Sequence, residues 1–577
     1  MHPLSLTGKR WRVGKDLRPE SDSLLAHQWR ESSFAVLSTL AEERGFKTLE
    51  DIGKRGLPGM DAHLFPDLPK AMDRIEAATT KKETITIFGD YDCDGVTSTA
   101  QLVRFFRRRG IEPMVRLPHR VDDGYGLKEK HIEECRAQGT TLLLTVDTGI
   151  SAAKEIALAR SAGIDVIVLD HHHVPDVLPD AYALLHPSLC VESIASPPSA
   201  AGVAWSVVRA LEEHADGVGI LWEDRETDLA LAAIGTVADL VELRGSNRDL
   251  VRAGLDALMS MTGGPLFLLM EQAGLHPPIT SRDIAFRIAP RLNAAGRMDD
   301  PMIALRAMLG DRESLTALEE LNRNRQDFLS ILLKFAEREM KNAALPFLCL
   351  ASSEYPPGLA GLIASKLTES TGRPSLVAGI QGNLCTASLR SIPGYHITEA
   401  LASCKEFLTS YGGHAQAAGC TFPLASFQAI QEQLSADLLS KMPAEELLPG
   451  IALDAVLSES QVTLDLCERL REFEPFGQGN MEPRFLIPNV LLQDVRTVGR
   501  ESTHLQARLN DKKVIGFGLG SLLNEMNQPV DLACRLGVDT WNGKSSAQVF
   551  MDDIRPAERQ DVHRQAATAQ TQQHVSR

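Results

Sequence analysis

Three short β-rich runs, each followed at once by acidic or histidine residues, constrain most strongly what this chain can fold into. The runs lie at 85–88, 142–146 and 164–169, and helical patterns at 97–109 and 151–162 separate them. This alternation predicts an α/β fold with a parallel sheet covered by helices. Because the carboxyl ends of parallel strands share one edge, where ligands bind, the residues after the three runs should meet there.

The residues at the predicted strand ends are carboxylates and imidazoles: Asp90, Asp92, Asp94, Asp147, Asp170, His171, His172 and His173. Carboxylates gathered at one edge repel one another and raise each other's pKa unless cations neutralise them. An oxygen-rich set with imidazole and without thiolate suits Mn²⁺ or Mg²⁺ better than structural zinc. Asp239 is a further candidate, because an unpaired charge among its apolar neighbours would be costly. Two ions that share a carboxylate could activate water against a phosphoester.

Each of these patterns also has a purely structural interpretation. A single Asp-x-Asp after a strand is more often a turn or a helix N-cap than a metal site. The segment 170–173 alone suits a solvated loop as well as a ligand set, and Asp239 alone suits a hydrogen-bonded carboxylate at a helix end. Only the joint placement of three strand ends favours metal binding.

Length and charge restrict the possible functions further. The 577 residues suggest three to five folded units, and 60 Lys and Arg against 76 Asp and Glu give a net charge of −16. Nucleic-acid binding would therefore need a local basic surface. No apolar run has the length of a membrane helix, the N-terminus lacks a signal-peptide stretch, and nine cysteines occur without a CxxC pair. We therefore expect a cytoplasmic protein with reduced thiols.

Pattern changes along the chain predict its division into parts. We expect an N-terminal cover region at 1–80, a parallel α/β domain at 81–310, one long connecting helix at 311–343, a second α/β domain at 344–445, a small β-barrel at 450–556 and a disordered tail at 557–577. The barrel aromatics Phe473, Phe476 and Phe485 could stack on bases, but core packing is the favoured interpretation for them.

The motifs, taken in order, resemble a known superfamily. GDYDCDG (89–95), VDTGI (146–150), DHHHVP (170–175) and GTVADLVEL (235–243) are similar to the DHH phosphoesterases. DDGYGL (122–127), PRLNAAGRMDD (290–300), SLRSI (388–392) and GGHAQAAG (412–419) resemble, within that superfamily, the RecJ family of single-stranded-DNA-specific 5′ to 3′ exonucleases. The resemblance covers about 80–556. It implies a DHH domain, a connecting helix, a DHHA1 domain and a C-terminal OB-fold.

The resemblance also assigns roles at the expected metal centre. It implies two Mn²⁺ or Mg²⁺ ions held by Asp92, Asp94, Asp147, His171 and Asp239, with Asp147 as the bridge. It places His172 beside the scissile phosphate and makes Asp170 a partner that orients the histidines. Many superfamily members carry a ligating His where this chain has Phe88, so the first ion would use Asp90 or water.

A second set of residues is implied to contact nucleic acid: Arg291, Asn293, Arg297, Ser388, Arg390, Gly413 and His414. Arg390 is favoured as a phosphate clamp because a planar guanidinium can donate two hydrogen bonds to phosphate. Without the resemblance, the arginines of 282–297 would more often be ordinary surface, and Gly413 would be part of a tight turn. At EYPPGLAG (354–361) this chain departs from the family, which often has a Trp-His pair there.

The resemblance implies stepwise release of mononucleotides from the 5′ end in DNA recombination and repair. Single-stranded-DNA-binding protein and a RecQ-type helicase are implied as partners, and we expect a monomer. Two rivals remain: a DHH phosphodiesterase of short oligonucleotides or cyclic dinucleotides, and an inactive scaffold that binds single-stranded DNA. The extra β-rich domain disfavours the first rival, and the retained Asp and His residues disfavour the second.

Overall fold

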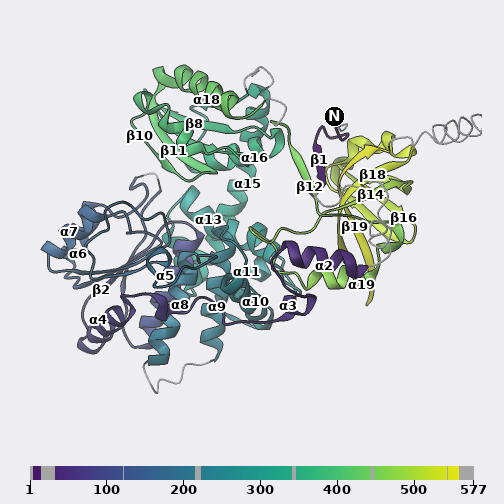
Figure 1. Cartoon of the computed structure of the whole chain (residues 1–577). Helices are drawn as coiled ribbons and strands as arrows, with labels where there is room; N and C mark the ends of the chain where they lie inside the picture. Colours follow the sequence, from purple (N-terminus) through teal and green to yellow (C-terminus); the bar gives the residue numbers. More distant parts are fainter. Residues whose placement is uncertain are drawn as a thin grey trace, which may run out of the picture. The chain divides into compact units, whose positions relative to one another are not determined.

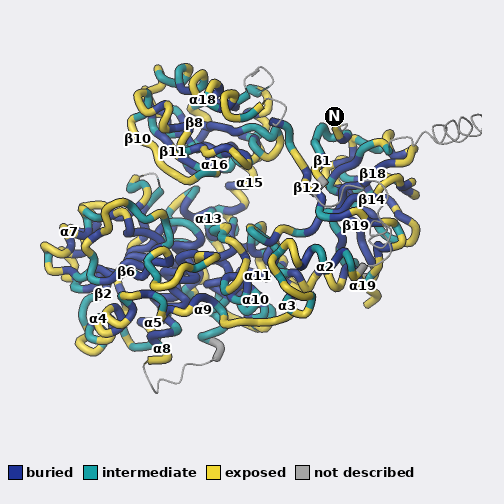
Figure 2. Tube along the Cα trace, in the orientation of Figure 1, coloured by how far each residue is buried: buried dark blue, intermediate teal, exposed yellow. Residues whose placement is uncertain are grey.

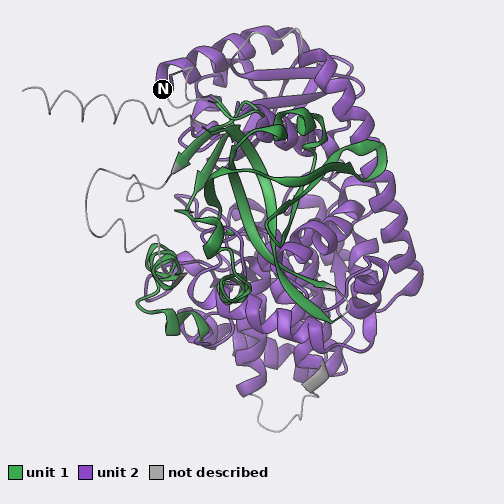
Figure 3. Cartoon of the chain, turned by 90° about the vertical axis from the view of Figure 1, so that its right-hand side faces the viewer, with its two compact units in different colours: residues 1–53, 448–473, 482–577 green, residues 54–447, 474–481 purple. Residues whose placement is uncertain are grey.

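The computed structural model describes residues 4–13, 33–120, 122–214, 222–340, 346–443, 447–541 and 543–557. The chain forms two compact units, coloured separately in Figure 3. The smaller unit comprises Met1–Gly53, Leu448–Phe473 and Glu482–Arg577, and the larger comprises Lys54–Leu447 and Glu474–Met481. The segment predicted as one N-terminal cover, 1–80, is therefore divided between the units. Apart from residue 557, the tail predicted to be disordered lies outside the described residues.

The larger unit contains the predicted parallel sheet. Its strands follow the order β3 (Met114–Arg116), β2 (Ile85–Phe88), β4 (Leu142–Val146), β5 (Asp165–Leu169) and β6 (Ala183–Leu185), and all four pairings are parallel. Strands β2 and β4 are buried along their whole length, as near-continuous apolar runs predict. Figure 2 shows buried, dark blue segments in this part of the unit. Strand β3 pairs on one side of β2 and β4 pairs on the other, so the topological switch point of the sheet lies between β2 and β4.

Helices cover both faces of this sheet (Figure 1). One face packs against α4 (Leu68–Lys81), α5 (Cys93–Arg108) and α8 (Ala200–His214). The other packs against α6 (Glu129–Ala137) and α7 (Ala153–Ser161). The expected α/β architecture is confirmed, although α5 begins inside the acidic motif, earlier than the predicted helix at 97–109.

A helical part follows and leads to the long predicted helix. Its elements are α9 (Trp222–Ala238), α10 (Gly245–Ser260), α11 (Gly264–Gln272), α12 (Ser281–Asp283), the π-helix η3 (Ile284–Ile288), α13 (Ala289–Met298), α14 (Met302–Met308) and α15 (Arg312–Met340). Within the described ranges, no single helix is long and apolar enough to cross a membrane, and only α10 and α11 together, bent by 82°, reach that length and composition.

The second α/β part belongs to the same unit. Its sheet has the order β10 (Ser410–Gly413), β11 (Ala417–Pro423), β9 (Leu384–Arg390), β8 (Ser375–Gln381) and β7 (Leu348–Ser352), in which only β7 and β8 are parallel. Helix α16 (Pro357–Thr371) packs on one face together with α15. Helices α17 (Ile397–Ala402) and α18 (Phe427–Lys441) pack on the other face.

The smaller unit is built on a seven-stranded sheet. Its order is β13 (Ala455–Val456), β14 (Phe485–Val490), β18 (Val530–Trp541), β19 (Lys544–Pro556), β17 (Lys512–Gly516), β16 (His504–Leu509) and β15 (Gln493–Val498). The N-terminal strand β1 (Arg10–Val13) pairs in parallel with β12 (Gly450–Leu453). Trp11 is buried beside β12, and its Nε1 donates to Asp553 at 2.7 Å. Phe473 and Phe485 are buried, as core packing predicts.

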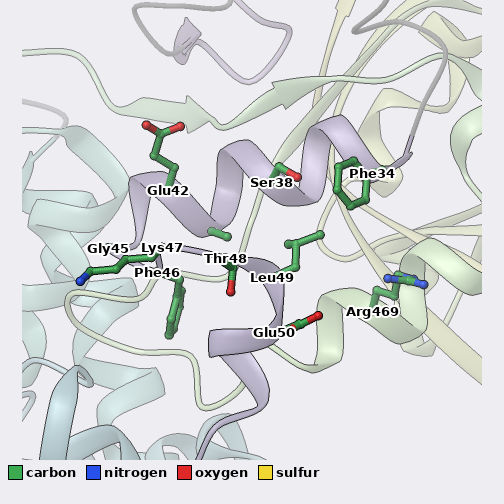
Figure 4. A pocket seen from close by; sticks show the side chains of 11 residues that line it. Phe34, Ser38, Glu42, Gly45, Phe46, Lys47, Thr48, Leu49, Glu50 and Arg469 are labelled. Carbon is green, nitrogen blue, oxygen red and sulfur yellow. The ribbon is translucent and has the colours of Figure 1, made fainter.

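The smaller unit also has a pocket of about 1,020 Å³ between α2 (Ser33–Glu43), α3 (Leu49–Gly53) and α19 (Leu464–Arg471) (Figure 4). Two cations, Lys47 and Arg469, and two anions, Glu42 and Glu50, lie on its lining. Since these charges are balanced, the pocket favours no charged class of ligand.

Candidate metal centre

The acidic loop after β2 and the loop after β4 meet at the switch point of the parallel sheet. Asp92 is the N-cap of α5, where its Oδ1 accepts N–H groups of Asp94 at 3.0 Å and Gly95 at 3.1 Å. The structural interpretation of the Asp-x-Asp pattern is thus correct for this oxygen. Metal binding by Asp92 would use its other oxygen, Oδ2.

Asp94 lies in the first turn of α5 and is buried. Its Oδ2 accepts the N–H of Ala200 at 2.7 Å and its Oδ1 that of Ala201 at 3.0 Å, so the carboxylate caps the start of α8. The positive end of the helix dipole favours a carboxylate there. Burial and repulsion from Asp92 nevertheless raise the pKa of Asp94 to about 7.

His171 stands among three of the predicted carboxylates. Its Nε2 is 3.2 Å from Asp147 Oδ1 and 3.9 Å from Asp94 Oδ2, and its Nδ1 is 3.7 Å from Asp239 Oδ2. Within the described structure, the buried Nε2 has no hydrogen-bond partner. Burial and the neighbouring His172 lower the pKa of His171 to about 4, so the ring is neutral and keeps a lone pair for a cation.

Three groups of side chains bring ligand atoms within 4.8 Å of one another: Asp90 with Asp92 and Asp147, Asp94 with His171 and Asp239, and Asp147 with His171 and His172. Asp147 belongs to two groups, which is the arrangement that a bridging carboxylate requires. It has a left-handed backbone, with φ of 62°.

The donor set fits Mn²⁺ or Mg²⁺. Burial and mutual repulsion raise the pKa values of Asp90, Asp147 and Asp239, and Oδ1 of Asp90 is buried without a described hydrogen-bond partner. A divalent cation relieves the repulsion because it neutralises the carboxylates. It also accepts the lone pairs that have no hydrogen-bond partner. Phe88 supplies no ligand: it is fully buried and packs on His131, with ring centroids 4.9 Å apart.

Asp170 contacts both His171 and His172 and fits the predicted orienting role. Its Oδ2 accepts the N–H of Ile150 at 2.9 Å, and its Oδ1 accepts the N–H of His171 at 2.8 Å and lies 2.8 Å from Nδ1 of His172. Burial alone would raise the pKa of Asp170, but the hydrogen bonds from His172 and Ile150 and the positive charges of the neighbouring histidines together outweigh it and lower the pKa to about 2. Asp170 therefore stays ionised and fixes the proton of His172 on Nδ1.

A pocket of about 580 Å³ opens beside the centre and reaches the second α/β part of the same unit. Its lining includes His172, Asp239 and His414. The rings of His172 and His414 are stacked, with centroids 6.2 Å apart and 20° between planes. Gly413 has φ of 142°, and a Cβ there would lie 2.5 Å from the carbonyl oxygen of Ala417. Glycine is therefore required to bring His414 to this position.

Three arginines lie next to the centre: Arg120, Arg297 and Arg390. Burial and repulsion from Arg120 and Arg390 lower the pKa of Arg297 to about 9. Arg390 shares β9 with Ser388, and its Nε donates to Ser365 at 3.1 Å. Nε of Arg120 is buried and lacks a hydrogen-bond partner among the described residues. Half-buried guanidinium groups that repel one another form a site for an anion such as phosphate.

Two predicted contacts with nucleic acid have other roles in the structure. The guanidinium of Arg291 is held by Glu319 of α15 at 2.7 Å and by the carbonyl of Arg287 at 2.6 Å, so it is not a free phosphate clamp. Oδ1 of Asn293 accepts the N–H of Cys93 at 3.1 Å. Asn293 thus secures the start of α5 rather than facing a substrate through this oxygen.

Sequence reasoning missed Arg120 and Tyr125 as site residues. The guanidinium of Arg120 lies 4.0 Å from the ring centroid of Tyr91, and the hydroxyl of Tyr125 lies 3.3 Å from Nδ1 of His172. Both belong to the loop after β3; its DDGYGL segment was the signal that could have indicated Tyr125, whereas Arg120 precedes that segment.

Gly235 of α9 gives a prediction for the centre. A Cβ there would lie 2.5 Å from Cβ of Ala201 and 2.6 Å from Oδ1 of Asp94. We expect Gly235→Ala to lower the free energy of unfolding by about 2 kcal/mol through overpacking and to weaken Mn²⁺ binding, measured by calorimetry.

Gly254→Ala is the matched control, since its Cβ would lie 2.2 Å from Cβ of Ala233, away from the carboxylates. It should destabilise the fold and leave the Mn²⁺ dissociation constant unchanged. Equal effects of both variants on Mn²⁺ binding would contradict the prediction.

Comparisons with known proteins agree with this geometry. Family models match the N-terminal domain of the DHH family at residues 84–234, the DHHA1 domain at 344–439 and the RecJ OB domain at 453–553. The chain is 33% identical to the single-stranded-DNA-specific exonuclease RecJ of Thermus thermophilus over 563 residues, which cover 95% of this chain and 79% of that protein. It is 31% identical to the enzyme of the same name from Escherichia coli, and the match covers 90% of this chain and 96% of that protein.

Solved structures give the same result. The crystal structure of RecJ in complex with Mn²⁺ from Thermus thermophilus matches with a TM-score of 0.79 at 30% identity, covering 95% of this chain and 80% of that one. The corresponding Mg²⁺ complex matches with a TM-score of 0.74 at 29% identity, and the match covers 95% of this chain and 79% of that one.

Proposed function

The chain belongs to the RecJ family of single-stranded-DNA-specific exonucleases, and we infer from this premise that it is a metal-dependent nuclease that hydrolyses single-stranded DNA. The observation that carries the inference is the pairing of two features in one unit. A carboxylate and histidine cluster able to hold divalent cations adjoins a group of arginines that repel one another. A phosphodiester satisfies both, because its oxygens can bind cations and accept hydrogen bonds from guanidinium groups.

We propose a division of roles among the side chains. Asp92, Asp94, Asp147, His171 and Asp239 would hold the ions, with Asp90 completing the all-carboxylate group. Bound Mn²⁺ or Mg²⁺ would supply an activated water and neutralise charge on the phosphate.

The substrate-facing residues form a second group. His172, whose proton on Nδ1 is fixed by Asp170, would face the scissile phosphate. Arg297 and Arg390, with Arg120, Ser388 and the Gly413-His414 loop, would hold the nucleotide.

We further propose 5′ to 3′ polarity with release of mononucleotides, because the arginine group offers positive charge for a terminal phosphate. The test uses a long oligonucleotide, labelled internally, as a single strand and as a duplex in Mn²⁺. The expected result is a ladder of mononucleotides from the single strand only, and a blocked 5′ end should stop it. Equal degradation of both forms, or of a 3′ end alone, would overturn the proposal.

The rival activity on short oligonucleotides or cyclic dinucleotides would not need an additional strand-binding surface. The smaller unit offers such a surface on β16 and β17. Phe517 follows β17 and is 62% exposed, and its ring meets His504 edge-on with centroids 5.3 Å apart. Arg508 of β16 lies directly opposite Lys513 of β17 in the register of these two strands. Aromatic rings beside cations are suited to stack on bases and to follow a phosphate backbone.

Phe517→Ala tests this role of the smaller unit. Since stacking of a base on an aromatic ring contributes about 1–3 kcal/mol, we expect binding of a long single strand to weaken by roughly 10-fold, measured by fluorescence anisotropy. Cleavage of a very short oligonucleotide should not change. Leu491→Ala, also at an exposed apolar residue of this unit, is the control. Unchanged affinity in Phe517→Ala would rule out the stacking role.

We also propose that the enzyme works as a cytoplasmic monomer in DNA recombination and repair, with single-stranded-DNA-binding protein and a RecQ-type helicase as partners. All nine cysteines are free, which suits a reducing compartment. Sedimentation of the purified protein and co-purification with each partner would test these points; a stable dimer or no retention of either partner would contradict them.

A further inference from the structure

His186 lies behind the loop that carries the histidines of the centre. It is fully buried and stands between β6 and the short 3₁₀ helix η2 (Pro187–Leu189). Its Nδ1 accepts the N–H of Ser188 at 3.1 Å. Its Nε2 lies 2.8 Å from the backbone carbonyl oxygen of His172. The roles proposed above do not include this side chain.

The first contact determines the direction of the second. A ring nitrogen that accepts an N–H keeps its lone pair, so the proton of a neutral His186 is on Nε2. A carbonyl oxygen can only accept, and Nε2–H of His186 therefore donates to His172. The ring thus joins two backbone groups: the N–H at Ser188 and the carbonyl at His172.

We propose that His186 is a positioning residue that holds the peptide of His172, so that the His172 imidazole faces the phosphate beside the metal centre. This inference rests on the proposed function. Asp170 holds His172 from the amide side, because its Oδ1 accepts the His172 N–H at 3.2 Å. His186 holds the carbonyl side, so both backbone hydrogen-bonding groups of His172 are fixed.

The surroundings of the His172 ring make this fixation important. The ring lies close to two other rings, those of Tyr125, with centroids 5.5 Å apart, and His414, with centroids 6.2 Å apart. Ser188, whose N–H binds His186, also lines the pocket at the centre. His186 therefore joins the histidine loop to the wall of the substrate pocket. A displacement of about 1 Å at a reacting group is enough to cost about 100-fold in rate.

Two substitutions test the two hydrogen bonds of His186 independently. In His186→Gln the terminal amide nitrogen takes the place of Nε2 and can still donate to the His172 carbonyl. In His186→Asn the side-chain oxygen takes the place of Nδ1 and can still accept the Ser188 N–H, but the side chain is too short to reach His172. The measurements are kcat and KM on a single-stranded oligonucleotide in Mn²⁺, the Mn²⁺ dissociation constant by calorimetry, and the crystal structure of the Asn variant.

We expect His186→Asn to lower kcat by about 10- to 100-fold, with KM and the Mn²⁺ dissociation constant changed by less than about threefold, and His186→Gln to restore most of kcat. Equal kcat in the wild type and both variants would overturn the proposal, as would equal losses of kcat and Mn²⁺ binding in both. If the wild type fails to degrade single-stranded DNA, the proposed function fails instead. The crystal structure then decides on His186, because an unmoved His172 in the Asn variant would contradict the positioning role.

Discussion

Asp147→Asn is expected to lower turnover on single-stranded DNA by at least about 10³-fold, because it removes the carboxylate shared by two groups of metal-ligating atoms. Asparagine has almost the same size, but its amide carries no negative charge and its nitrogen cannot bind a cation. The Asn side chain also tolerates the left-handed backbone of this position, so the change should leave the fold intact. The loss should appear in kcat rather than in DNA binding by the smaller unit.

The experiment compares single-turnover rates, DNA affinity and Mn²⁺ binding in the wild type and the variant. Asp73→Asn is the matched control, since Asp73 is an exposed aspartate on α4 of the same unit and the same charge is lost. We expect the control to behave as the wild type. Residual activity of Asp147→Asn within 10-fold of the wild type would exclude a bridging role, as would unchanged binding of Mn²⁺.

The sheet that carries this centre was predictable from the sequence. The runs at 85–88 and 142–146 are β2 and β4 without any change of bounds, and β5 begins one residue later than predicted. Strands buried on both faces read as short continuous apolar runs, and this signal is local. Once the strands are parallel, their ends share one edge, so the meeting of Asp94, Asp147 and His171 follows from topology.

Features that depend on partners far away in the sequence were not predictable. The pairing of β1 with β12 and the contact of Trp11 with Asp553 leave no local pattern, so the sequence does not indicate that residues 1–80 are divided between the two units. Arg120 follows β3, a short edge strand with no continuous apolar run. The pairing of Arg291 with Glu319 depends on α15, and an arginine-rich segment indicates charge without revealing its partner.

The binding of Mn²⁺ should depend on pH because the ion competes with protons for the same carboxylates. In the metal-free protein the pKa of Asp94 is raised to about 7, and those of Asp147 and Asp239 are raised above their usual range by burial and repulsion. Below these pKa values the groups hold protons that must leave before the ion binds. The pKa of His171, lowered to about 4, places its titration below the range of interest.

We therefore expect the Mn²⁺ association constant to rise by at least about 10-fold from pH 6 to pH 8, with release of protons on binding. Calorimetry at pH 7 in two buffers of different ionisation enthalpy measures the released protons directly. Asp94→Asn should release fewer protons than the wild type, because one titrating group is lost. The same affinity at pH 6 and pH 8, with no proton release, would show that the carboxylates are already ionised without metal.

The same pKa shifts set the pH dependence of stability. A carboxyl group whose pKa is higher in the folded than in the unfolded chain stabilises the metal-free fold below its unfolded pKa, and this stabilisation is lost as pH rises through the folded value. For Asp94 the loss extends from about pH 4 to about pH 7. Bound Mn²⁺ compensates the ionised carboxylates, so the increase in Tm that Mn²⁺ produces over EDTA should be larger at pH 8 than at pH 6. An increase that is independent of pH would mean that the stabilising ion binds elsewhere than at these carboxylates.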